Sequence, residues 1–143
     1  MQLTRRQTLL AAASAAFATA LPVRSFAAAS VEEFTGGAEV GTGGITLTTP
    51  EIAENGNTVP FSVSVDSPMT DSDHVKTVHV FATKNPNPSV VSFNFTPASG
   101  KAEATSRMRL GSTQDVIAVA EMSDGKFYMT KTQVKVTIGG CGG

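Results

Sequence analysis

The residue best suited to covalent chemistry is a cysteine at the third position from the end of the chain. The chain ends VTIGGCGG (residues 136–143), and Cys141 is its only cysteine. The cysteine is flanked on both sides by glycines, namely Gly139, Gly140, Gly142 and Gly143. A free cysteine ordinarily prefers the interior, whereas chain ends are seldom buried and glycine has the greatest backbone freedom of any residue. The sequence therefore predicts a mobile arm over residues 139–143 that carries an exposed thiol.

This thiol lacks the surroundings of a catalytic nucleophile. A catalytic thiol is activated by a neighbouring base, a cation or a helix N-terminus, but Cys141 has only glycines and the terminal carboxylate beside it in the sequence. We therefore expect no catalytic residue in this chain, and we interpret Cys141 as a point of covalent substrate attachment on an arm offered to other enzymes. The alternative is an exported structural or binding module whose single cysteine forms an intermolecular disulfide, because an unpaired cysteine favours such pairing.

The remaining polar residues predict neither a metal site nor a cofactor site. His74 and His79 are the only histidines, and their odd separation places them on opposite faces of a continuous strand. Two histidines and one cysteine do not match the ligand spacing of a zinc site, and no glycine-rich loop lies between a strand and a helix. Arg107 and Arg109 share a face that either attracts an anion or forms an exposed edge of the domain, and we favour the exposed edge.

Length and composition limit the classes of function. The chain has 143 residues, of which 41% are apolar and 16% charged, and its net charge is −1. These values are typical of one globular domain. The near-neutral charge excludes a nucleic-acid binder driven by global basicity, and a single cysteine excludes a disulfide within the chain.

Residues 1–29 predict a cleavable export signal. Arg5 and Arg6 precede an uncharged segment, Leu9 to Leu21, which is shorter than the roughly 20 residues of a membrane-spanning helix. The small residues 27–29 fit a cleavage site, and the arginine pair resembles a twin-arginine signal; an ordinary secretory signal is the alternative. We therefore expect an exported protein without a membrane anchor. Because the twin-arginine route exports folded cargo and the sequence shows no cofactor motif, we expect a second subunit to accompany the chain.

The body of the chain, residues 30–143, alternates apolar and polar residues with the period of two that is typical of strands. The clearest runs are residues 59–65, 91–95, 102–110 and 134–138. Turn-forming residues separate the runs, namely Asn55-Gly56, Ser67-Pro68, residues 85–88, Gly100 and Asp124-Gly125. About seven strands at this spacing predict one all-β domain, an immunoglobulin-like antiparallel β-sandwich. Before the strands, a capping box with Ser30 as the N-cap predicts a very short helix.

Residues 116–120 are apolar on both faces, and residues 78–82, which include His79, are nearly so. Such a strand is either covered on both sides by its own chain or covered on one side by another protein. Together with the export argument, this pattern leads us to favour an obligate partner. Substitutions at Phe81, Ile117 or Val119 are then expected to disturb assembly more than folding.

The ending VTIGGCGG resembles the carrier arm of SoxY, the sulfur-carrier subunit of the periplasmic sulfur-oxidation system. Four further segments resemble segments of that family, namely residues 50–56, 66–70, 84–86 and 107–110, so the resemblance covers the whole mature chain. It implies an immunoglobulin-like carrier, not an enzyme, that pairs with a SoxZ-like subunit in the periplasm. It also implies that Cys141 carries thiosulfate-derived sulfur.

The same resemblance implies an order of reactions on the arm. A SoxAX-like haem protein joins thiosulfate oxidatively to the thiol of Cys141. A SoxB-like hydrolase then removes sulfate, and further enzymes oxidise the sulfur that remains. No cofactor and no metal of the carrier itself is implied.

Overall fold

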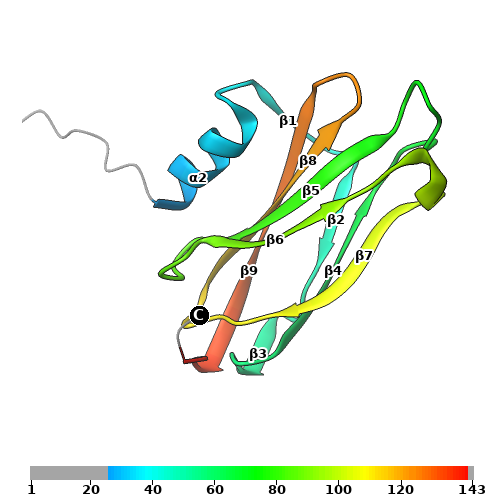
Figure 1. Cartoon of the computed structure of the whole chain (residues 1–143). Helices are drawn as coiled ribbons and strands as arrows, with labels where there is room; N and C mark the ends of the chain where they lie inside the picture. The colour runs from blue at the N-terminus through cyan, green and yellow to red at the C-terminus, as the bar shows by residue number, and fades with distance from the viewer. Residues whose placement is uncertain (1–25, 142–143) are drawn as a thin grey trace, which may run out of the picture.

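The alternating segments of the sequence form nine strands in the part of the chain that the structure describes, residues 26–141 (Figure 1). The structure is a computed structural model. Helix α2 (Phe26–Thr35) precedes the strands, and the 3-10 helix η1 (Pro97–Ser99) interrupts them. The strands are β1 (Val40–Thr42), β2 (Ile45–Thr48), β3 (Ile52–Asn55), β4 (Val59–Val65), β5 (Val75–Ala82), β6 (Ser89–Asn94), β7 (Ala102–Met108), β8 (Gln114–Met122) and β9 (Phe127–Ile138). The arginine pair and the apolar segment of the predicted export signal lie outside the described residues.

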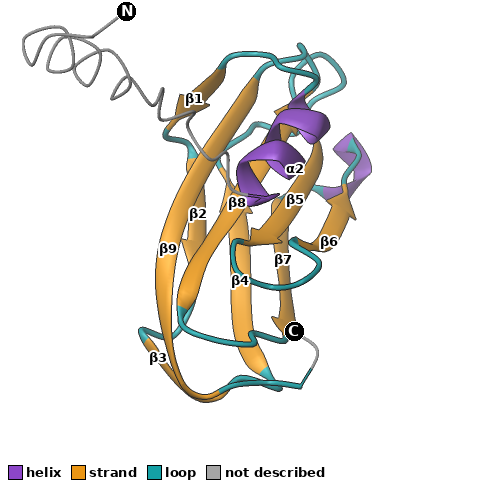
Figure 2. Cartoon of the chain, turned by 90° about the vertical axis from the view of Figure 1, so that its left-hand side faces the viewer, coloured by secondary structure: helices purple, strands orange, loops and turns teal. Residues whose placement is uncertain are grey.

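The strands form two sheets that pack face to face (Figure 2). The larger sheet has the order β1-β9-β8-β5-β6, with β3 also paired to β9, and the smaller sheet has the order β2-β4-β7. The predicted β-sandwich is confirmed, but β1 and β3 run parallel to β9 at its two ends. The prediction of about seven strands was low because β1, β2 and β3 have only three or four residues, too few to show a period. The immunoglobulin-like character stays a prediction.

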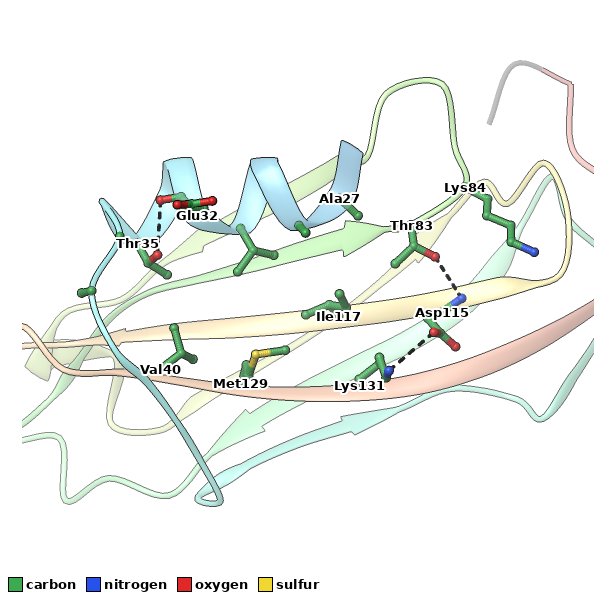
Figure 3. A pocket seen from close by; sticks show the side chains of 14 residues that line it. Ala27, Glu32, Thr35, Val40, Thr83, Lys84, Asp115, Ile117, Met129 and Lys131 are labelled. Atoms are coloured by element: carbon green, nitrogen blue, oxygen red, sulfur yellow. Dashed lines mark hydrogen bonds and ion pairs between the residues drawn. The ribbon is translucent and has the colours of Figure 1, made fainter. Parts of the chain in front are cut away.

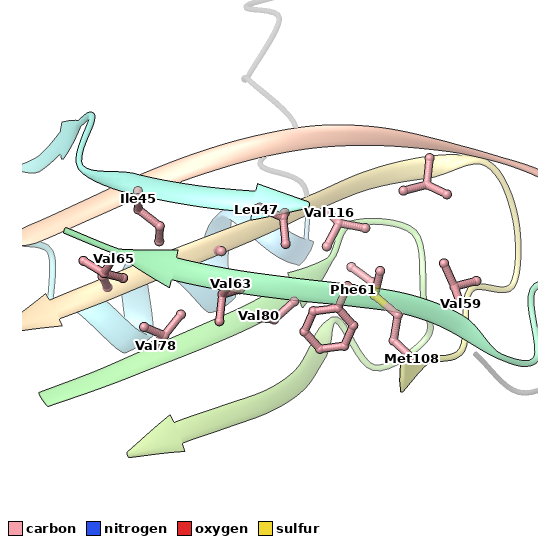
Figure 4. Packing of buried hydrophobic residues seen from close by; sticks show 14 of the residues in the cluster. Ile45, Leu47, Val59, Phe61, Val63, Val65, Val78, Val80, Met108 and Val116 are labelled. Carbon is pink, nitrogen blue, oxygen red and sulfur yellow. The ribbon is translucent and has the colours of Figure 1, made fainter. Parts of the chain in front are cut away.

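Strand β4 shows how the alternation produces this core. Val59, Phe61 and Val63 point inward and are at most 2% exposed, whereas Pro60 is exposed and Ser62 is partly exposed. The inward side chains pack against Val80 of β5 and Val116 of β8 between the two sheets (Figure 4). Each fully buried side chain of this size stabilises the fold by about 1.5–3 kcal/mol.

Helix α2 is longer than the sequence predicts. It has ten residues, so Ser30 lies inside it, and the expectation that Ser30 is the N-cap is wrong. The preceding residues 27–29 are alanines, which have the highest helix propensity and extend the helix backwards. The helix ends where expected, since Gly36 and Gly37 have left-handed φ angles of 63° and 78°. Cleavage after residue 29 would remove its first turn; the cleavage site stays a prediction.

The outer face of the larger sheet is covered by α2 (Figure 2). Val31 and Phe34 of the helix pack on Phe81, Ile117 and Val119, which are 2%, 8% and 0% exposed. The sequence left open whether this face is covered by the chain itself or by another protein. The structure shows that the chain itself covers it, so our expectation that a partner protein covers Phe81, Ile117 and Val119 is wrong. The physical reason is that α2 carries two apolar side chains, Val31 and Phe34, and both pack on this face of the sheet.

A groove of about 630 Å³ lies between α2 and strands β8 and β9 (Figure 3). Ile117 and Met129 form its apolar floor. At one end, Lys131 Nζ lies 3.7 Å from Asp115 Oδ2. Ala27 belongs to the helix side of the groove, so a cleavage after residue 29 would widen it.

Candidate functional site

The C-terminal arm leaves the sandwich at the end where β3 turns into β4 and where β7 ends (Figure 1). Strand β9 ends at Ile138, and residues 139–141 continue between two loops, residues 56–57 and residues 110–111. Segments that are far apart in the sequence therefore meet at the predicted carrier arm. Gly142 and Gly143 lie outside the described residues, and the mobility of the arm stays a prediction.

Backbone hydrogen bonds join the arm to both loops. Gly56 donates its N–H to the carbonyl of Ile138 at 2.7 Å, and Leu110 donates its N–H to the carbonyl of Gly56 at 2.8 Å. Gly140 in turn donates its N–H to the carbonyl of Leu110 at 2.9 Å. The three bonds form a closed circuit in which each segment contacts the other two. The root of the arm is thus docked on the domain in this structure.

Three glycines allow this docking because they have no side chain. A Cβ added at Gly56 would lie 2.2 Å from the carbonyl oxygen of Leu110, and one added at Gly139 would lie 2.2 Å from that of Gly111. A Cβ at Gly140 would lie 2.7 Å from the carbonyl oxygen of Gly56. None of Gly56, Gly139 and Gly140 has a left-handed φ. Glycine is therefore required at these positions because the backbone of the arm and the backbone of the loops lie too close together for a side chain. This role is separate from the flexibility that the sequence suggested.

Cys141 lies at the outer end of the docked segment. Its thiol is free and exposed, and its backbone N–H donates to the side-chain oxygen Oδ1 of Asn57 at 3.1 Å. The arm thus contacts the domain through backbone atoms and one amide side chain, and it leaves the sulfur accessible. This arrangement can carry a group on the sulfur at the surface of the protein.

A buried polar network supports the loop that receives the arm. Asn85 donates its side-chain N–H to the carbonyl of Arg109 at 2.8 Å and accepts the N–H of Gly111 at 3.1 Å. Gln114, which is 1% exposed, donates to the same oxygen of Asn85 at 2.9 Å. Because buried polar groups are costly unless they are paired, this network fixes the position of residues 109–111. The acceptor of the Gly140 N–H is therefore held in place from beneath.

Sequence reasoning did not single out the residues that receive the arm. It read Asn55-Gly56 as a turn and gave no role to Asn57 or Gly111. The signal that could have found them is the set of family-like segments, because residues 50–56, 84–86 and 107–110 all converge on the arm or on its supporting loop. The sequence shows that these segments are similar to the family but not that they meet.

The histidines stand apart from Cys141 and from each other. His74 Nδ1 lies 3.0 Å from the carbonyl oxygen of Thr70. Both ring nitrogens of His79 are hydrogen-bonded to serine hydroxyls, those of Ser89 and Ser92. Burial lowers the pKa of His79 below its usual value of 6.5. Within residues 26–141, no group of three His, Cys, Asp or Glu side chains is arranged to hold a metal ion.

The described part of the chain contains no helix that is both long and apolar enough to cross a membrane. Comparison with curated proteins gives no match.

Some solved structures share the fold at low sequence identity. The superoxide reductase (neelaredoxin) of Ignicoccus hospitalis is 13% identical with a TM-score of 0.61, over 68% of this chain and 94% of that chain. A putative superoxide reductase of Thermotoga maritima is 18% identical with a TM-score of 0.57, over 72% of this chain and 89% of that chain. At this level of identity the likeness concerns the sandwich alone.

One solved structure is similar in sequence as well. The sulfur carrier protein SoxY from Chlorobium limicola f thiosulfatophilum is 32% identical with a TM-score of 0.65, over 77% of this chain and 94% of that chain. The family model of the sulfur oxidation protein SoxY matches residues 31–141, which include the sandwich, the docked root of the arm and Cys141. The chain belongs to the SoxY family of sulfur oxidation proteins.

Proposed function

We propose that the protein carries thiosulfate-derived sulfur covalently on Cys141 and presents it on the C-terminal arm to partner enzymes of thiosulfate oxidation. One observation carries the proposal: the only thiol of the chain is exposed at the end of a segment that contacts the domain almost entirely through backbone atoms. A thin segment of this kind fits a narrow channel better than a loop with side chains does. The chain is then a substrate carrier, and its partners perform the chemistry.

The attachment step requires an electron acceptor. When the sulfur of Cys141 bonds to the outer sulfur of thiosulfate, one S–S bond forms, and the thiol proton and two electrons are released. The family resemblance assigns the electrons to a SoxAX-like haem protein. A SoxB-like hydrolase then adds water to the terminal sulfur of the attached group, which releases sulfate and leaves a persulfide on Cys141.

The proposed setting is the periplasm, after export through the twin-arginine route. A SoxZ-like subunit is the proposed heterodimer partner, consistent with export of folded cargo. The face under α2 is already covered by the chain over Phe81, Ile117 and Val119, so we place the partner elsewhere on the domain.

The carrier function is tested by the intact mass of the purified chain after incubation with tetrathionate. A thiolate displaces thiosulfate from tetrathionate, which leaves one thiosulfate unit on the cysteine without any enzyme. We expect a single adduct on the parent chain and none on Cys141→Ser, whose thermal unfolding should be unchanged because the side chain is exposed. With thiosulfate and a SoxAX-like partner, the same adduct should form only when the partner is present.

The rival function, a module cross-linked through its cysteine, predicts a different mass. Under nonreducing conditions the protein purified from its natural source would then carry a protein-sized adduct on Cys141 that resists exchange with small thiols. That result, or an adduct that persists in Cys141→Ser, would contradict the carrier function.

A further inference from the structure

We propose that Asn57 is a positioning residue that holds the carrier arm in a docked conformation, from which the arm is released before its thiol enters another protein. This inference rests on the proposed carrier function and concerns the regulation of the same site. The observation behind it is the hydrogen bond from the N–H of Cys141 to Oδ1 of Asn57 at 3.1 Å. It is the bond farthest along the arm in the part of the chain that the structure describes.

The loop that carries Asn57 is itself fixed. The N–H of Asn57 donates to Oδ1 of Asn55 at 3.0 Å, and the carbonyl of the preceding residue, Gly56, accepts the N–H of Leu110 at 2.8 Å. Because the segment is bound both within itself and to Leu110, the amide of Asn57 meets the arm without ordering a flexible loop. The side chain thus acts on the arm as part of a preformed surface.

The docked arm and the free arm differ in reach. In the docked state the bonds at Gly140 and Cys141 hold the segment along the surface of the domain. In the released state the three residues after Ile138 extend through about 10 Å, at 3.3–3.6 Å per residue. Entry into a partner's channel therefore requires that both bonds break, while the sandwich and Ile138 stay in place.

The bonds that hold the arm suit a reversible state. Cys141 and Asn57 are exposed, so water can replace the hydrogen bond between them when it breaks. Close packing of three glycines gives the docked state a specific geometry, but it buries no large side chain of the arm. Segments with few buried apolar contacts open most easily in folded proteins. A partner that binds the free arm can therefore release it at a small cost.

The inference predicts that the bonds at Gly140 and Cys141 open together. The Asn57→Ala substitution removes the acceptor of the Cys141 amide itself. Faster hydrogen exchange at Cys141 would therefore not show whether the rest of the arm is released. The amide of Gly140 keeps its own acceptor, the carbonyl of Leu110, and becomes more exposed only if Asn57 holds the whole arm. The exchange rate of the Gly140 amide is therefore the diagnostic measurement.

The experiment is amide hydrogen exchange by NMR on the parent chain and three variants, under conditions where exchange follows the opening equilibrium. We expect the Gly140 amide to exchange about threefold to tenfold faster in Asn57→Ala, the factor that corresponds to one net hydrogen bond. Asn57→Asp keeps the acceptor atom and should restore protection. Asn94→Ala is the matched control, because Asn94 also accepts one exposed side-chain hydrogen bond, from Thr77, on strand β6 away from the arm.

Two results would overturn the inference: an unchanged exchange rate of the Gly140 amide in Asn57→Ala, or an equal acceleration in Asn94→Ala. The amides of β8 serve as the internal standard, since they report global unfolding and should stay protected in all variants. The outcome is independent of the carrier function, which is tested by the mass of the Cys141 adduct. A chain that carries no sulfur can still show a docked arm, and a sulfur carrier can show a free one.

Discussion

Two regions of this protein are covered by very different means. The outer face of the larger sheet is covered by side chains: the ring of Phe34 on α2 lies 6.2 Å from that of Phe81 and 5.9 Å from that of Phe127, measured between centroids. The docking site of the arm is covered by backbone, and its contacts exist because Gly56 and Gly139 have no side chain. Large apolar burial holds the first region, whereas a few hydrogen bonds hold the second.

The two kinds of contact indicate which region can move during function. Full burial of a side chain such as Phe81 contributes about 1.5–3 kcal/mol, and the partly buried Val31 and Phe34 add a share of such a contribution each, so the helix stays in place. A hydrogen bond that water can replace contributes about 0.5–1.5 kcal/mol, so a segment held by a few of them exchanges readily. Permanent cover and reversible docking thus coexist in one small domain, and the thiol lies on the reversible part.

The largest effect is expected where side chains are removed from the helix-covered face. Phe81 is 2% exposed and packs with Ile117 and Val119. Because Phe81→Ala leaves a cavity among them, we expect a loss of about 3–5 kcal/mol in the free energy of unfolding. Denaturant unfolding of the purified chain, without any partner, measures this loss.

Phe127→Ala is the matched control for the same cluster. Phe127 is only partly buried, so its truncation should cost less than that of Phe81. If Phe81→Ala unfolds like the parent chain and weakens only assembly with a second subunit, the comparison fails. The face would then be held by a partner, as the sequence alone led us to favour.

A smaller effect is expected where a side chain is added to the docking site. In Gly56→Ala the new Cβ would lie 2.2 Å from the carbonyl oxygen of Leu110. Relieving such a contact forces two loops apart, and overpacking of this kind costs about 1–3 kcal/mol. Gly139→Ala should cost less, because the arm can undock to avoid Gly111, and it should increase hydrogen exchange at Gly140. Denaturant unfolding and amide exchange measure the two effects.

Gly111→Ala separates a steric effect from a general effect of alanine. A Cβ at Gly111 would have its nearest neighbours at 3.9 Å, an ordinary contact, and its φ is not left-handed. We therefore expect Gly111→Ala to be within about 0.5 kcal/mol of the parent chain, because the new Cβ meets no close neighbour and the backbone N–H keeps its bond to Asn85. Equal losses in Gly56→Ala and Gly111→Ala would show that close approach is not what these glycines provide.

The same contrast explains how much the sequence could predict. The sandwich was predictable because its inward residues, such as those of β4, repeat with period two along one strand. The cover of its outer face was not, since Val31 and Phe34 pack on that face only after the chain has folded back over the sheet, and the length of α2 was also missed because the alanines before Ser30 resemble the end of an export signal. Helix propensity acts on those alanines whether or not they are later removed.

The sequence was sufficient to predict the reactive residue of the site but not the residues that hold the arm in place. Cys141 stands out because a lone thiol among glycines is visible in the sequence, without any tertiary information. Asn57 and Gly111 carry no such signal, because their roles arise only when β9 brings the chain end back to two loops. The sequence predicts flexibility at Gly139 and Gly140. Only the packing shows that both residues also lie too close to neighbouring backbone for a side chain to fit.

The smallest effect is expected at the boundary of the helix-covered face, where His79 packs beside two aromatic rings. Its ring centroid is 4.3 Å from that of Phe81 and 5.1 Å from that of Phe34, and burial lowers its pKa below 6.5. The folded chain then binds fewer protons than the unfolded chain between the lowered pKa and 6.5. Stability is therefore complete above pH 6.5 and decreases as the pH falls through that window.

Comparison of two histidine variants assigns this pH dependence. We expect a decrease of less than about 1 kcal/mol, because the half-exposed ring is screened by solvent and because Glu33 of α2 lines the same hollow. The slope of unfolding free energy against pH should disappear in His79→Gln and persist in His74→Gln. A slope that survives in His79→Gln would mean that this histidine does not couple the helix to the sheet. Such a result would leave the aromatic side chains as the whole support of the covered face.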